Sequence, residues 1–314
     1  MTAFAVEVAT DARFALAEGP IWDPDAKTLH WVDMVDGAVF SGSIVGSRIE
    51  QTERHARPNS MVSAVFPLES GAMITTQGDS VVILGDDADG GRRMRLVPPG
   101  LAGRLNDAAV DPQGRLVAGT APRGPVTGAE VILRLESDGS VLEIDHGLGL
   151  SNGIAWSPDG ALMYSVDTAA RAIYVRSYDT EIPGPRREFV HITLGQPDGL
   201  CIDEEGNLWV AIWGAGEVHC YDPDGSRIHT LSVPAPHTSS VAFAGDGLSQ
   251  LVITTATAGL SAHRATLHPL SGSIFLADVG ARGVASPRVA EEALHMLPPG
   301  DDGMRARIRS AGRE

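Results

Sequence analysis

Residues 197–213 read Pro-Asp-Gly-Leu-Cys-Ile-Asp-Glu-Glu-Gly-Asn-Leu-Trp-Val-Ala-Ile-Trp. A polar start at Asp198-Gly199 leads into a short apolar run. An acidic turn through Gly206 follows, and then a second apolar run from Leu208 to Ile212. Short apolar runs separated by a glycine-containing turn are typical of two antiparallel strands. This stretch therefore predicts a strand, a tight turn and a strand.

The same pattern recurs upstream, where it starts at Asn106 and at Asn152. The residue numbers 106, 152 and 198 differ by 46 in each step. With weaker copies included, the chain has six units, which start at Glu18, Ser63, Asn106, Asn152, Asp198 and Ser240. Repeats of about 40–50 residues built from short strands are typical of propeller blades. We therefore predict an all-β fold, a six-bladed β-propeller, that forms one domain over residues 1–314. We expect the tail after about residue 282 to be partly irregular.

Several strands within the repeats can be predicted individually. The first repeat predicts strands at Thr28–Asp33 and Ala38–Ser43, and the fifth predicts a third strand at Glu217–Tyr221. A lone strand at Phe4–Val8 precedes the first repeat. We expect it to complete the last blade, because closing the ring in this way removes exposed strand edges.

Composition excludes several classes of partner and site. Lys and Arg number 24 against 40 Asp and Glu, a formal net charge of −16, which argues against nucleic acid because phosphate binding needs a basic face. No apolar run approaches the roughly 18 residues of a membrane span. The two cysteines, Cys201 and Cys220, are too few for a disulfide framework or a cysteine-rich zinc site. The first residues lack the basic and apolar regions of an export signal, so we predict a cytoplasmic protein. The oligomeric state stays undetermined.

The residues that start the repeats are the candidate site. In a propeller the innermost strand of each blade lines the axis, so residues at the same phase of different repeats converge at one mouth of the channel. Glu18, Asn106, Asn152 and Asp198 would bring hard oxygen donors together, which suit Ca²⁺, Mg²⁺ or Mn²⁺. The alternative is that an Asp or Asn before Gly is an ordinary turn residue. Glu18 is a poor turn former and favours the site.

Arg104 is the basic residue nearest to this group in the sequence. It lies two residues before Asn106. A guanidinium there would hold an oxygen-rich substrate through several donors. The alternative is a surface arginine paired with Asp107.

Four motifs in this order and spacing resemble the gluconolactonase/regucalcin family, also called senescence marker proteins: Leu16–Trp22, Arg104–Asp107, Ser151–Gly153 and Pro197–Asp203. The resemblance implies a six-bladed propeller with one catalytic divalent metal at the channel mouth. It implies Glu18, Asn152 and Asp198 as metal ligands, and Arg104 and Asn106 as substrate contacts. Ca²⁺ is favoured, with Zn²⁺, Mn²⁺, Mg²⁺ and Fe²⁺ as alternatives. Some members carry an acid shortly after the second strand of the third repeat, where this chain reads Thr-Ala-Pro-Arg-Gly over 120–124.

The function that follows is a metal-dependent sugar lactonase, which opens an aldonolactone to the sugar acid. In this hypothesis the metal polarises the lactone carbonyl and supplies the attacking water. Asp198 is the expected general base, since a ligand carboxylate lies beside that water. The expected partner is a small-molecule sugar lactone.

Two alternatives stay open. The same pocket would act on a non-sugar ester, such as a phosphotriester or an acyl-homoserine lactone, if its mouth were more apolar. A non-enzymatic protein, either a Ca²⁺-binding regulator of the regucalcin type or a docking module, would also fit the repeats. A panel of lactones tested with and without metal discriminates among these readings.

Overall fold

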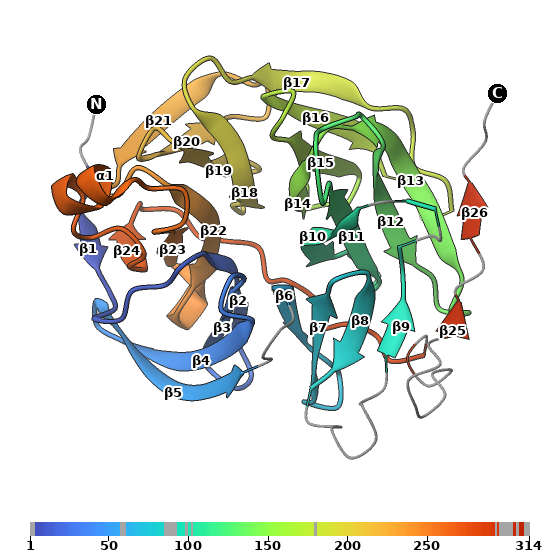
Figure 1. Ribbon diagram of the computed structural model, residues 1–314, viewed down its shortest axis with the longest axis horizontal. Coiled ribbons are helices and arrows are strands. Elements are labelled where there is room, and N and C mark those ends of the chain that lie inside the picture. The colour runs from blue at the N-terminus through green and yellow to red at the C-terminus, as the bar shows by residue number, and fades with distance from the viewer. Residues whose placement is uncertain are drawn as a thin grey trace.

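A computed structural model describes residues 4–56, 61–84, 93–97, 100–101, 103–178, 181–292, 294, 304–305 and 308–310. Its strands form six sheets arranged around a central axis (Figure 1). In each sheet the strand nearest the axis is β2, β6, β10, β14, β18 or β22. The predicted all-β, six-bladed propeller is confirmed. No helix in the described part of the chain is long and apolar enough to cross a membrane.

The first three blades are built from consecutive strands. Blade 1 contains β2 (Ala17–Asp23), β3 (Thr28–Asp33), β4 (Ala38–Val45) and β5 (Arg48–Ala56). Blade 2 contains β6 (Val62–Pro67), β7 (Met73–Gln77), β8 (Ser80–Ile83) and β9 (Arg93–Arg95). Blade 3 contains β10 (Arg104–Val110), β11 (Leu116–Ala121), β12 (Glu130–Leu135) and β13 (Val141–Leu148).

Blades 4 and 5 repeat this order, and blade 6 departs from it. Blade 4 contains β14 (Ser151–Trp156), β15 (Leu162–Asp167), β16 (Ala172–Ser177) and β17 (Arg187–His191). Blade 5 contains β18 (Gln196–Ile202), β19 (Leu208–Trp213), β20 (Glu217–Tyr221) and β21 (Arg227–Ser232). Blade 6 contains β22 (Thr238–Ala244), β23 (Gln250–Thr255) and β24 (Phe275–Asp278), with a short 3-10 helix at Asp246–Leu248 and the helix α1 (Ala262–Leu267) in its connections.

The N-terminal strand closes the ring. Strand β1 (Val6–Val8) pairs antiparallel with β24 and becomes the outermost strand of blade 6. This confirms the closure predicted for Phe4–Val8. The strand that precedes blade 1 therefore completes the sheet of blade 6. This pairing ties the first blade to the last and covers the strand edge of β24 that would otherwise be exposed.

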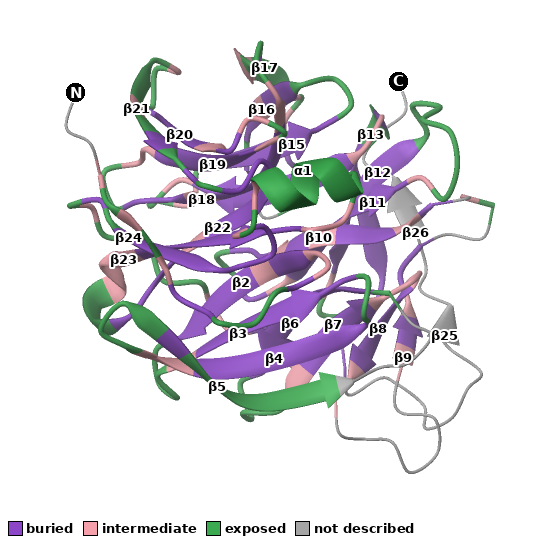
Figure 2. Cartoon of the chain, turned by 60° about the vertical axis from the view of Figure 1, so that its left-hand side comes forward, coloured by how far each residue is buried: buried purple, intermediate pink, exposed green. Residues whose placement is uncertain are grey.

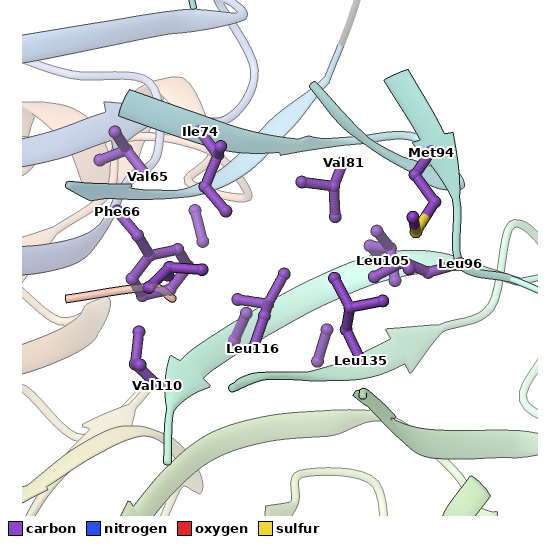
Figure 3. Close-up of a cluster of buried hydrophobic side chains, with 14 of the residues drawn as sticks. Val65, Phe66, Ile74, Val81, Met94, Leu96, Leu105, Val110, Leu116 and Leu135 are labelled. Carbon is purple, nitrogen blue, oxygen red and sulfur yellow. The ribbon is translucent and has the colours of Figure 1, made fainter. Parts of the chain in front are cut away.

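Adjacent blades are held together by apolar side chains between their sheets. Figure 3 shows the layer between blades 2 and 3, where Val65 and Ile74 of one blade face Leu116 and Leu135 of the other. Leu105, also in this layer, is 1% exposed. Each such side chain contributes roughly 1.5–3 kcal/mol when it leaves water, so these layers fix how the inner strands sit against one another.

The segment after β24 crosses the face of the propeller opposite the starts of the inner strands. In Figure 1 it runs as an orange trace from β24 towards blade 2. Gly283 forms a bridge with Asp203, and Val289 forms a bridge with Leu68. Arg288 donates to both carboxylate oxygens of Asp23, at 2.8 and 2.9 Å. Strands β25 (Met304–Arg305) and β26 (Ile308–Ser310) then extend the sheets of blades 2 and 3 in parallel.

Candidate active site at the channel mouth

The six residues that start the repeats all lie near the beginning of an innermost strand. At this level the ladder to the second strand shifts register in every blade, for example between Glu18 and Ile21 and between Pro197 and Leu200. A bulge of this kind bends a strand and re-aims a side chain. The irregularities therefore sit where the polar side chains of neighbouring blades meet.

Two glycines allow the inner strands to approach closely at this level. A Cβ at Gly153 would lie 2.7 Å from the carbonyl oxygen of Asp198 in the next blade. A Cβ at Gly199 would lie 2.7 Å from the Cα of Ser240. Real side chains do not occupy such spaces, so the glycines after Asn152 and Asp198 allow the neighbouring blades to approach this closely.

Buried aspartates hold the chain just before two of the site residues. Asp33 accepts hydrogen bonds from the backbone N–H groups of Ala15 and Leu16, at 2.7 and 3.2 Å. In blade 4, Asp167 accepts from Gly149 and Leu150, at 2.9 and 3.1 Å. These bonds fix the backbone that leads into Glu18 and Asn152.

In blades 2 and 6 the side chains at this level are hydroxyls that bond to protein groups. Ser63 Oγ hydrogen-bonds to Thr76 Oγ1 at 2.7 Å within blade 2. In blade 6, Ser239 Oγ hydrogen-bonds to Thr254 Oγ1 at 2.9 Å and donates to the carbonyl oxygen of Ala17 in blade 1 at 2.6 Å. Among the described residues, the carboxylates and amides that start the repeats come from blades 1, 3, 4 and 5.

A directed chain of hydrogen bonds links blades 3, 4 and 5. Arg104 Nη1 donates to Asn106 Oδ1 at 2.7 Å, and Asn106 Nδ2 donates to Asn152 Oδ1 at 2.7 Å. Asn152 Nδ2 donates to Thr168 Oγ1 at 2.7 Å, and Thr168 Oγ1 donates to the carbonyl oxygen of Pro197 at 2.7 Å. Each amide is oriented by the next group. The chain ends on the residue before Asp198.

The structure thus brings all five predicted site residues to one end of the channel. Arg104, Asn106 and Asn152 are in direct contact through the hydrogen-bond chain. Glu18 is 8% exposed and Asp198 is 6% exposed, and the two carboxylates interact electrostatically. Arg104 bonds to Asn106 and to the carbonyl oxygen of Leu105, at 2.9 Å, in place of the ion pair with Asp107 considered as an alternative.

Three carboxyl groups share this end of the channel. Burial raises the pKa of Glu18 well above its usual value, and the charges of Asp198 and Asp107 raise it further. Burial and then the charge of Asp107 raise the pKa of Asp198. Burial raises the pKa of Asp107 to about 6, although the N–H group of Ala108 donates to its carboxylate. Glu18 and Asp198 are buried and Asp107 is half-buried, so ionisation of all three carboxyl groups would leave an excess of negative charge.

The positive charge nearby does not balance these acids. The pKa of Arg104 is lowered by its own burial and by the charge of Arg123, and is raised by Glu18 and Glu130. Arg104, whose guanidinium is half-buried, therefore carries one positive charge against three carboxyl groups, and the guanidinium of Arg123 beside it is exposed to water. A bound divalent cation would remove the imbalance, and hard oxygen donors are the ligands that such ions prefer.

The donors that fit a cation must include an amide. Among the described residues, no three Asp, Glu, His or Cys side chains converge closely enough to hold a metal ion. Asn152 Oδ1 lies in the polar group between Asn106 and the blade 5 strand. The residues present fit a hard divalent cation with two carboxylates and one amide, the set that the family resemblance implies.

Three polar residues of this region were not assigned a site role from the sequence. Thr168 is buried in the turn between β15 and β16 and orients Asn152. Asp107 follows Asn106 directly, so its position after a candidate ligand was a usable signal. Glu130, 5% exposed at the start of β12, lies against the residue before Arg104: a Cβ at Gly103 would be 2.5 Å from Glu130 Oε2.

An apolar cavity of about 390 Å³ lies next to the acidic group along the channel. Asp107 lines it, whereas Glu18, Asn152 and Asp198 do not. Its walls include Trp22 and Trp156 from inner strands, and residues 284–287 line it as well. The polar groups that fit a cation therefore lie outside this cavity, at the mouth formed by the strand starts.

Thr168→Val is expected to lower kcat/KM for the protein's substrate by roughly 10- to 100-fold, the usual effect of losing a group that orients a ligand residue. Valine keeps the shape of threonine but leaves Asn152 Nδ2 and the carbonyl oxygen of Pro197 without their shared partner. Steady-state kinetics and metal titration of the purified variant measure the effect. Thr168→Ser, which keeps the hydroxyl, is the matched control. Equal losses in both variants would contradict the orienting role.

The chain is similar to known proteins over most of its length. Residues 16–257 match the family described as the SMP-30/Gluconolactonase/LRE-like region. A pentonolactonase of Haloferax volcanii is 33% identical over 285 residues, which cover 87% of this chain and 94% of the relative. A 6-deoxy-6-sulfogluconolactonase of Pseudomonas putida is 32% identical, with 88% and 95% covered.

A solved structure shows the same architecture. The calcium-binding protein regucalcin from Agrobacterium tumefaciens superposes with a TM-score of 0.82 at 29% identity, and the match covers 92% of this chain and 99% of that chain. Since the family match spans well over half of the sequence and includes all five predicted site residues, the chain belongs to the SMP-30/gluconolactonase/LRE-like family.

Proposed function

We propose that this protein is a metal-dependent lactonase that opens a sugar (aldono-) lactone to the sugar acid. The observation that carries the proposal is the acidic group at the channel mouth, next to two amides oriented by hydrogen bonds and a guanidinium. The two curated relatives described above are both named as sugar lactonases. Their names support the same chemistry for this chain.

Glu18, Asn152 and Asp198 would hold the divalent ion. Ca²⁺ is favoured because the oxygen donors suit it and the regucalcin with a similar fold is named as calcium-binding. When bound, the ion supplies electrophilic stabilisation of the lactone carbonyl oxygen and lowers the pKa of a water molecule.

The chain's own residues would do the positioning and the proton transfer. Asp198 would accept the proton from the attacking water and return it to the ring oxygen as the ester bond breaks. Arg104 and Asn106 would orient the oxygens of the sugar. The hydrogen bonds of Arg104 within the described residues use Nη1 alone, which leaves Nε and Nη2 for a ligand.

A lactone panel tests the proposal directly. Protein dialysed against a chelator is mixed with freshly dissolved hexono- and pentonolactones, and proton release is followed before and after addition of Ca²⁺, Mn²⁺, Mg²⁺ or Zn²⁺. Spontaneous hydrolysis is subtracted using protein-free samples. We expect hydrolysis of at least one sugar lactone only when metal is present.

The same panel separates the alternatives. It includes a phosphotriester and an acyl-homoserine lactone, and a preference for either would assign the site to a non-sugar ester. Metal binding without hydrolysis of any compound would favour a non-enzymatic calcium-binding protein. Hydrolysis of sugar lactones by the metal-free protein at the full rate would contradict metal dependence.

A further inference from the structure

The loop after β11 places an arginine beside the mouth of the site. In the β10–β11 ladder, Ala121 is paired with Arg104, and Arg123 follows two residues later. Its Nε donates to the carbonyl oxygen of Gly103 at 3.4 Å. On its other side, a Cβ at Gly78 would lie 3.6 Å from Arg123 Nη2. The guanidinium therefore lies between the start of β10 and the turn that joins β7 to β8.

Arg123 is an unbalanced charge among the described residues. Its hydrogen bond to Gly103 is the one it forms with them, and none of their carboxylates makes an ion pair with it. The acid nearest in sequence to Gly78 is Asp79, which pairs with Arg95 at 3.1 Å. Arg123 is exposed, so its Nη groups face water.

The charges of Arg123 and Arg104 interact electrostatically. The charge of Arg123 is the second cause, after burial, that lowers the pKa of Arg104. Glu18 and Glu130 raise the pKa of Arg104, whereas no carboxylate in the described part of the chain forms an ion pair with Arg123. Two neighbouring guanidiniums repel each other, and an anion bound beside them relieves that repulsion. The chain carries a net charge of −16. The two neighbouring guanidinium groups of Arg104 and Arg123 therefore have the opposite sign to the molecule as a whole.

We propose that Arg123 is a specificity-determining residue that binds an oxyanion substituent of the substrate, with Arg104 holding the ring oxygens. The preferred substrates are then sugar lactones that carry a phosphate, sulfonate or carboxylate away from the ring carbonyl. This inference rests on the proposed lactonase function, because it names the substrate class of the same site. A planar guanidinium suits such groups, since it donates two parallel hydrogen bonds to one oxyanion.

The test compares two lactones that differ in one group. D-Glucono-δ-lactone is neutral, and its 6-phosphate carries the oxyanion. We expect the metal-loaded protein to show a kcat/KM about 10- to 100-fold higher for the 6-phosphate, the size expected for charge-assisted hydrogen bonds. Arg123→Gln is expected to remove this preference by lowering kcat/KM for the 6-phosphate to about that of the neutral lactone. Arg123→Lys is expected to keep part of it. The preference is expected to shrink as salt is added.

Arg187→Gln is the matched control, because Arg187 is an exposed arginine on the outermost strand of blade 4. This variant is expected to leave kcat/KM unchanged for both lactones. Equal rates for the two lactones with the unchanged protein, or an equal loss for both in Arg123→Gln, would overturn the inference.

A binding measurement separates this inference from the proposed function. Glucitol 6-phosphate has no lactone bond, so its binding does not depend on hydrolysis. Calorimetry is expected to show binding that is weakened by Arg123→Gln, while binding of glucitol is unaffected. Anion-dependent binding without hydrolysis of any lactone would defeat the proposed function and keep the oxyanion site. Hydrolysis of lactones with no preference for the 6-phosphate would support the proposed function and defeat the oxyanion site.

Discussion

Asp198→Asn is expected to lower kcat for lactone hydrolysis by at least about 10³-fold, because it removes a proposed general base that is also a proposed metal ligand. Asparagine has nearly the same shape, so the hydrogen-bond chain that ends at Pro197 is expected to survive. Steady-state kinetics at saturating metal, with bound metal counted by elemental analysis, measures the change.

The Tm of the metal-free protein distinguishes a loss of catalysis from a loss of folding. The pKa of Asp198 is raised by burial and by Asp107, so the ionised carboxylate destabilises the empty site. Removing its charge is expected to raise the Tm of metal-free protein at neutral pH while activity is lost. Asp224→Asn, in the exposed turn of the same blade, is the control and is expected to change neither quantity. Near-normal activity of Asp198→Asn would remove Asp198 from the mechanism.

Removal of the divalent ion is expected to change how stability depends on pH. In the folded metal-free protein, Asp107 has a pKa of about 6, against 3.8 for an ordinary aspartate. Between these values the folded state binds more protons than the unfolded state, so stability falls as pH rises. The two-unit difference corresponds to roughly 3 kcal/mol. Glu18 and Asp198 shift the profile in the same direction, since their pKa values are also raised.

Thermal unfolding between pH 4.5 and 8 measures this profile with dialysed protein and with metal added. The metal-free protein is expected to lose stability from about pH 4 upwards through pH 6 and beyond. Added metal is expected to restore stability at neutral pH, because it binds only the folded state; at 100 times its Kd it contributes about 2.7 kcal/mol. Asp107→Asn is expected to flatten part of the metal-free slope. If the stability of the metal-free protein rose with pH over this range, the pKa values of the three carboxyl groups would not be raised as described.

The periodic features of the sequence were sufficient to predict the architecture. Strands at Thr28–Asp33 and Glu217–Tyr221 have the predicted bounds, and the strand predicted at Ala38–Ser43 continues to Val45. These strands are buried and apolar, and turn residues bound them, so local pattern and tertiary environment agree. The repeat also placed Glu18, Asn106, Asn152 and Asp198 together, because residues at the same phase of each blade start an inner strand.

The outermost strands of blades 1, 4 and 5 were not predicted from the sequence. Arg48–Ala56, Arg187–His191 and Arg227–Ser232 are rich in polar residues and largely exposed, as Figure 2 shows for β5. Their strand conformation depends on pairing with the third strand of each blade. Helix α1 was missed for a related reason, since none of its residues is buried and it has no apolar face.

The sequence by itself determined the blade number, the ring closure and which residues share the channel mouth, since these follow from a repeat whose units fold alike. Only the tertiary structure decided what lies between the repeats. Thr168 and Arg123 come from turns and loops outside the repeated phase, and each lies between its own blade and a neighbouring one. Contacts of this kind depend on how neighbouring sheets pack, and no local pattern encodes them.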